Sequence, residues 1–128
     1  MMKSDTRTPL SRASGLGSAK SGVGHWWAQR ISAVALIPLS LWFAASIIAH
    51  VGDDYAEVFA WLQSPLSAVL MTLLVAALFY HAALGLQTIV EDYFHSALKF
   101  AALVLIQLLS IALAIVGIAA IAKIAFAI

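Results

Sequence analysis

The sequence predicts an all-α membrane protein with three transmembrane helices. Of its 128 residues, 63% are hydrophobic and only 10% are charged, too few charges to cover the surface of a water-soluble domain. Three stretches without Asp, Glu, Lys or Arg reach the roughly 20 residues that a helix needs to cross a bilayer; they are Ile31–Gly52, Val58–Val90 and Phe100–Ala122. Backbone polar groups must be paired in lipid, so helices are the expected form.

The first element is a polar segment over residues 1–30, which is basic, rich in Ser and Gly, and without the apolar core of a signal peptide. We expect it to be a cytoplasmic tail, followed by a membrane anchor over residues 31–128. The middle apolar stretch is interrupted by Gln63-Ser64-Pro65, so its helix should start after the proline. The expected spans are about 31–50, 66–90 and 100–122.

The basic residues predict how the chain is oriented. Five of them precede the first span, one lies between the second and third spans, and one follows the third; in order they are Lys3, Arg7, Arg12, Lys20, Arg30, Lys99 and Lys123. Cytoplasmic loops carry the excess of Lys and Arg. The distribution therefore predicts a cytoplasmic N-terminus and a C-terminus on the opposite side.

The composition also excludes several functions. Cysteine is absent, which excludes disulfides, thiolate ligation of iron–sulfur clusters and cysteine nucleophiles. The sequence shows no glycine-rich phosphate loop, metal-binding cluster or hydrolytic triad. We therefore expect a chain that is not an enzyme by itself, with the lipid bilayer and other subunits as partners and no nucleic acid.

His81 is the residue most suggestive of a function. An ionisable side chain at membrane depth is costly and points to a functional site. It lies nine residues from Val90, about 13 Å along a helix and near mid-membrane. Gly85 follows on the same helix face and clears volume beside the imidazole, as a flat macrocycle would require. His81 could ligate haem iron, or it could only hydrogen-bond a neighbouring helix. No other histidine is well placed to pair with it, so a second haem ligand should come from another subunit.

Asp92 and Tyr93 lie about 17 Å further along the same helix, where hydrocarbon meets the cytoplasmic headgroups. A tyrosine hydroxyl can donate to a quinone carbonyl, and a nearby acid can orient it or relay protons. The alternative is an ordinary interfacial tyrosine beside acids that end a helix. Arg30 could neutralise a haem propionate, organise a quinone pocket, or serve as a positive-inside anchor.

Two blocks of the sequence carry a family resemblance. Residues 22–33 read GVGHWWAQRISA, and residues 81–93 contain the pattern H-x-x-x-G-x(6)-D-Y. Together with three spans and a short chain length, these blocks resemble the hydrophobic membrane anchor of succinate dehydrogenase, the D-type anchor of respiratory complex II. The resemblance extends over nearly the whole chain, and the second block is the more specific one.

The resemblance implies an anchor subunit of succinate:ubiquinone oxidoreductase, which serves the tricarboxylic acid cycle and electron transport in a bacterial inner membrane. Such a subunit holds a flavoprotein and an iron–sulfur subunit at the membrane. His81 would be an axial ligand of haem b, with the other histidine from a companion cytochrome b556 anchor. Tyr93 would hydrogen-bond ubiquinone with Asp92 beside it, and Arg30 would lie near the haem propionates.

Three other interpretations stay open. An anchor of a fumarate reductase shares the architecture and works in the opposite direction. A three-helix structural or assembly protein without a cofactor would use His81 only to hold two helices together. A small transporter component is the third, and it is disfavoured because the sequence has neither paired intramembrane charges nor an internal repeat.

Overall fold

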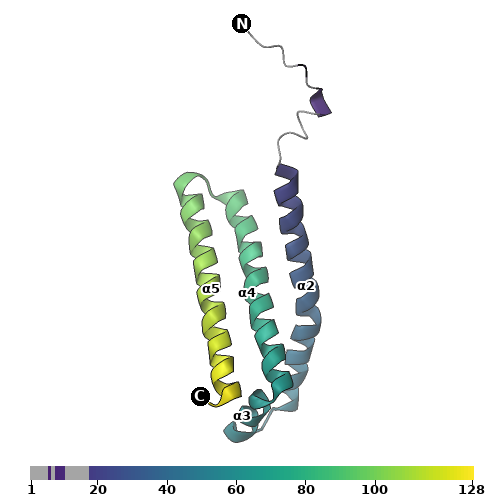
Figure 1. The fold of residues 1–128 in the computed structure, drawn as a ribbon, viewed down its shortest axis with the longest axis vertical. Coiled ribbons are helices and arrows are strands. Elements are labelled where there is room, and N and C mark those ends of the chain that lie inside the picture. The colour runs from purple at the N-terminus through teal and green to yellow at the C-terminus, as the bar shows by residue number, and fades with distance from the viewer. Residues whose placement is uncertain (1–5, 7, 11–17) are drawn as a thin grey trace.

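A computed structural model describes residues 6, 8–10 and 18–128 of the chain. The main elements are four helices: α2 (Ser18–Ala49), α3 (Tyr55–Gln63), α4 (Pro65–Tyr93) and α5 (Ser96–Phe126) (Figure 1). Three of them, all except α3, are long and apolar enough to cross a membrane. The predicted class, an all-α chain with three transmembrane helices, is confirmed.

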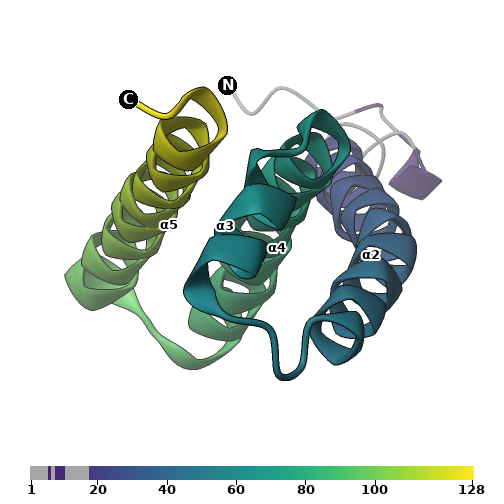
Figure 2. The same cartoon turned by 90° about the horizontal axis from the view of Figure 1, so that it is seen from below.

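The three long helices form an open row with α4 in the middle. Helix α4 packs against α2 on one side and α5 on the other, whereas α2 and α5 do not contact each other (Figures 1 and 2). Each long helix runs antiparallel to the one before it, so the start of α2 and the end of α5 lie at opposite ends of the row. Both faces of the row are left open to lipid or to other proteins.

The helices extend beyond the predicted spans. Helix α2 begins at Ser18, although the stretch free of charges begins only at Ile31. Charge limits how deep a residue can lie in lipid, but Lys and Arg are good helix formers and do not end a helix. Arg30 therefore lies within a continuous helix. Helix α4 likewise continues past Val90 to Tyr93.

The segment between the first two predicted spans contains the short helix α3. Asp54 caps its start: the Asp54 carboxylate accepts a hydrogen bond from the Glu57 backbone N–H, and the Glu57 carboxylate accepts one from the Asp54 N–H, both at 2.9 Å. This reciprocal arrangement is a capping box, which satisfies two backbone donors at a helix start. Ser64 then ends α3 and caps α4, whose first residue is Pro65. This short helix was not predicted from the sequence.

The chain buries little of itself. Among the described residues the buried side chains are the apolar Leu74 and Val90 and the polar Ser32 and Ser67. Such a small core would not hold a soluble domain together. In lipid the exposed apolar faces need no cover, and small or hydroxyl-bearing residues at helix contacts carry the association. Ser32 is one of these contact residues, and it lies in the α2–α4 interface.

Candidate functional site

The candidate site lies where α2 crosses α4. His81 on α4 faces α2, and its Nδ1 atom lies 2.9 Å from the hydroxyl oxygen of Ser32. The same hydroxyl lies 3.0 Å from the backbone carbonyl of Gln29 and donates to it. Ser32 is only 5% exposed. A hydrogen bond therefore joins residues 49 positions apart in the sequence and ties the two helices together at the depth of the histidine.

Gly85 faces the same contact one turn further along α4. A Cβ atom placed on it would lie 3.6 Å from Nε2 of Gln29, with no other side chain within 4 Å. The expected volume beside the imidazole thus exists, but within this chain the Gln29 amide extends over it. Gln29 is a long, flexible side chain, so it can move aside at small cost when another group binds there.

Buried polar atoms without partners lie along the same face of α2. Oε1 of Gln29 and Nε2 of His25 are shielded from solvent and have no hydrogen-bond partner in the described chain. Unpaired buried polar atoms are costly, and in a native assembly they usually find a partner. Arg30 packs its guanidinium 5.4 Å from the ring centre of Trp26 and has no carboxylate partner among the described residues. This region can accept a polar or anionic group from outside the chain.

The bond between Ser32 and His81 shows which residues of α2 lie at the same depth as His81. Counting along α2 from Ser32, Arg30 lies about 3 Å and His25 about 10 Å from the level of His81, whereas His50 lies about 27 Å away. Arg30 therefore lies at nearly the same depth as the histidine, but on the opposite side of α2 from Ser32. Both His25 and His50 are therefore too far away in depth to share an iron with His81. In the described part of the chain no group of three or more His, Cys, Asp or Glu could hold a metal ion.

His50 has a local role at the opposite end of α2. Its Nδ1 atom hydrogen-bonds the Ser46 carbonyl at 2.8 Å, its Nε2 lies 4.0 Å from Asp53, and its ring lies 4.6 Å from that of Trp61. These contacts stabilise the turn between α2 and α3.

Asp92 and Tyr93 form a separate, exposed group at the end of α4. Tyr93 is 78% exposed and lies about 18 Å along the helix from His81. Glu91 accepts a hydrogen bond from Gln87 at 3.0 Å, whereas Asp92 has no partner in the described chain. Both carboxylates sit in the last turn, which has no basic residue and where the helix dipole disfavours negative charge. Helix stability does not explain an acid at this position.

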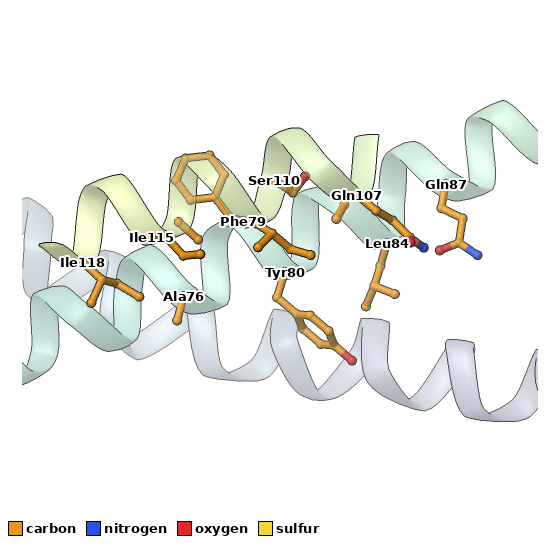
Figure 3. Close-up of a pocket in the computed structure, with 12 residues that line it drawn as sticks. Ala76, Phe79, Tyr80, Leu84, Gln87, Gln107, Ser110, Ile115 and Ile118 are labelled. Atoms are coloured by element: carbon orange, nitrogen blue, oxygen red, sulfur yellow. The ribbon is translucent and has the colours of Figure 1, made fainter. Parts of the chain in front are cut away.

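A pocket of about 390 Å³ opens between α4 and α5 (Figure 3). Its walls are mostly apolar, and the side chains with polar groups that line it are those of Tyr80, Gln87, Gln107 and Ser110. None of the four predicted site residues, His81, Arg30, Asp92 and Tyr93, lines it. The pocket and the histidine therefore lie on different sides of α4.

Comparison with known proteins identifies the family. The model of the succinate dehydrogenase/fumarate reductase transmembrane subunit family matches residues 4–121. The chain belongs to this family. Its relatives include proteins named succinate dehydrogenase hydrophobic membrane anchor subunit from three bacteria. The Rickettsia bellii protein is 37% identical over 72% of this chain and 74% of its own length. The Paracoccus denitrificans protein is 33% identical over 76% of this chain and 75% of its own length. The Rickettsia conorii protein is 30% identical over 84% of this chain and 86% of its own length.

No solved structure matched the chain. The family resemblance expected from the two sequence blocks is confirmed, and the chain is a membrane anchor of this family. Its relatives are named as subunits that anchor an enzyme, which agrees with the expectation that the chain is not catalytic by itself.

Proposed function

We propose that this membrane anchor belongs to a succinate:ubiquinone oxidoreductase, to which it supplies one axial ligand of haem b and part of the ubiquinone site. The observation that carries this proposal is the state of His81. Its Nδ1 is engaged by Ser32, while its Nε2 has no hydrogen-bond partner among the described residues. A histidine held by one nitrogen and open at the other is the usual arrangement of a metal ligand.

The surrounding residues fit a haem. Oε1 of Gln29 and Nε2 of His25 are buried without partners in the described chain, Gly85 offers a position without a side chain, and Arg30 has no carboxylate partner among the described residues. His81 would bind the iron, and Arg30 would pair with a propionate. Because no second histidine of this chain lies at the same level, the opposite ligand would come from a companion cytochrome b556 anchor. The bound haem would accept and release one electron at a time.

The exposed end of α4 fits a quinone-binding role. The Tyr93 hydroxyl can donate a hydrogen bond to a quinone carbonyl, which polarises the carbonyl as electrons arrive. The Asp92 carboxylate, which has no partner in the described part of the chain, can orient the hydroxyl or pass a proton to the reduced oxygen. Reduction of ubiquinone takes up two electrons and two protons, so a proton-handling group at the polar edge of the membrane is required.

The proposed assembly follows from this arrangement. The Lys and Arg distribution supports a cytoplasmic N-terminus in a bacterial inner membrane, which would place Tyr93 and the start of α2 on the cytoplasmic side. There they could meet the iron–sulfur subunit, which receives electrons from succinate oxidation in the flavoprotein. The family description also covers fumarate reductase, and comparing the rates of succinate oxidation and fumarate reduction distinguishes the two.

Replacing His81 tests the ligand role. In the intact complex we expect His81→Ala to lose the haem or to change its reduced-minus-oxidised spectrum, because the axial nitrogen is removed. His50→Ala is the matched control: it removes a histidine about 27 Å away in depth and should leave the spectrum unchanged. An unaltered spectrum in His81→Ala would contradict the ligand role and favour a structural protein without a cofactor.

A further inference from the structure

We propose that Ser32 is a positioning residue for His81: it holds the imidazole in the tautomer whose Nε2 is free to bind iron. This inference rests on the proposed haem function, because it concerns the same histidine. It assigns a role to a residue on α2, the neighbouring helix, that becomes visible only when the two helices are packed together.

A count of protons gives the tautomer. The Ser32 hydroxyl has one proton and two short contacts, at 3.0 Å to the Gln29 carbonyl and at 2.9 Å to Nδ1 of His81. The carbonyl has no proton to give, so the hydroxyl must be the donor in the first contact. The second contact is then a hydrogen bond only if Nδ1 carries the imidazole proton and donates it to the hydroxyl oxygen. Nε2 is left with a lone pair.

The opposite tautomer is disfavoured on two grounds. If the hydroxyl donated to Nδ1, its oxygen would face the Gln29 carbonyl oxygen at 3.0 Å with no proton between them. The imidazole proton would then sit on Nε2, which has no acceptor in the described chain. An N–H group without an acceptor in a membrane interior costs more than one pointed at a hydroxyl oxygen. Both the contact between two unbridged oxygens and the Nε2–H group without an acceptor therefore disfavour the opposite tautomer, and the proton is expected on Nδ1.

The position of Ser32 makes it a rigid acceptor. Its side chain is short, has a single rotatable bond and is 95% buried in the α2–α4 contact, since its exposed fraction is 5%. Its hydroxyl is anchored to the helix backbone three residues earlier. The imidazole ring is therefore oriented by the α2 backbone and not by a flexible side chain, and a ligand oriented in advance loses less entropy when it binds.

The bond should also tune a bound iron. A hydrogen bond from Nδ1–H to an acceptor increases the basicity of Nε2, which stabilises the more highly charged ferric state. Removing the acceptor should weaken haem binding and raise the midpoint potential. If Ser32 only filled space between the helices, haem affinity and midpoint potential would not depend on whether its side chain has a hydroxyl.

The test compares Ser32→Thr with Ser32→Val in the intact complex. The two side chains have nearly the same shape, and only threonine has a hydroxyl. We expect Ser32→Val to lose about 10- to 100-fold in haem affinity, the usual effect of removing such a supporting partner, and to raise the midpoint potential. Ser32→Thr should keep both values near those of the parent chain.

Two further variants control for packing. Ser32→Ala adds no bulk to the α2–α4 contact and should shift affinity and potential in the same direction as Ser32→Val. Ser67→Ala removes another serine of equal burial, 5% exposed, whose hydroxyl is hydrogen-bonded to Ser64. It lies about 21 Å along α4 from His81 and should leave the haem unchanged.

The outcomes separate this inference from the proposed function. If His81→Ala loses the haem while Ser32→Val and Ser32→Ala match Ser32→Thr in affinity and potential, His81 is a ligand and the role of Ser32 is refuted. If His81→Ala keeps an unaltered haem, the ligand role itself fails, and the positioning role fails with it. A shift of the midpoint potential that depends on the hydroxyl of residue 32 supports both the ligand role of His81 and the positioning role of Ser32.

Discussion

At the residue scale, the most constrained side chain is a histidine with two ring nitrogens and only one partner. Ser32 satisfies Nδ1 of His81, and within the described chain nothing satisfies Nε2. In water the free nitrogen would be hydrated, but in a membrane it has to be matched by another group or left at a cost. Tyr93 presents a different case, because its hydroxyl lies at an exposed helix end where water is available. Its role has to be tested by function and not by burial.

Removing the Tyr93 hydroxyl should affect only the quinone step. We expect Tyr93→Phe to lower succinate:quinone reductase activity about tenfold, the equivalent of one hydrogen bond of roughly 1.4 kcal/mol. Succinate oxidation with an artificial soluble acceptor should be unchanged, because an acceptor in solution bypasses the quinone step.

Tyr55→Phe is the matched control for this comparison. Tyr55 is as exposed as Tyr93, at 80% against 78%, but it lies on α3 at the other end of the row (Figure 1). Its variant should keep both activities. Equal loss of both activities in Tyr93→Phe would contradict a quinone role and indicate a general defect of the complex.

At the scale of elements, α4 is the central helix, because both of the other long helices pack against it. It contacts α2 through the hydrogen bond to Ser32, and it contacts α5 through close packing around Gly117. A Cβ atom on Gly117 would lie 3.0 Å from a methyl carbon of Val75 on α4. The glycine thus permits a close approach between the two helices, as small residues commonly do in membranes.

Enlarging Gly117 should separate α4 from α5. We expect Gly117→Leu to cost about 1–3 kcal/mol, the usual effect of overpacking a tight contact, seen as a lower thermal midpoint of the purified complex. Adding Val75→Ala should recover part of the loss, because it removes the methyl groups that the new side chain meets. Full additivity of the two changes would show that they do not meet at this contact.

At the scale of the whole molecule, the chain is a row of three helices with open faces (Figure 2). Its buried apolar side chains in the described part are only Leu74 and Val90. Lipid can cover apolar faces, but it cannot pair with Oε1 of Gln29 or Nε2 of His25, which are buried and have no partner among the residues that the structure describes. The fold therefore calls for other polar partners at the membrane interior, in agreement with membership of a multi-subunit family.

Gentle purification tests whether the chain has partner subunits. When the chain is tagged and extracted in mild detergent, we expect a flavoprotein, an iron–sulfur protein and a second three-helix anchor to copurify, as identified by mass spectrometry. The control is an unrelated membrane complex of known composition, recovered intact from the same extract. If that complex survives and the tagged chain is recovered alone, the proposed assembly is wrong.

Much of the fold could be predicted from local properties of the sequence. The three spans follow from stretches without charge, and the start of α4 follows from Pro65. The ends of the helices were less predictable, since α2 runs back to Ser18 through residues whose charge excludes them from lipid but not from a helix. Helix α3 was missed although the pair Asp54 and Glu57 has the spacing of a capping box; attention to that pattern would have found it.

By itself, the sequence determined the helical class, the number of spans, the family and His81 as the residue of interest. The class and the number of spans depend on the residues of each segment alone, because transfer of a helix into lipid is a sum over its own side chains. The family was recognised from two separate blocks of residues, and His81 from its position within one span. Only the tertiary structure decided that Ser32 is the partner of His81 and that Gln29 lies over Gly85. These contacts join helices far apart in the sequence, and the rotation and depth of each helix are set by packing against its neighbour and not by its own composition.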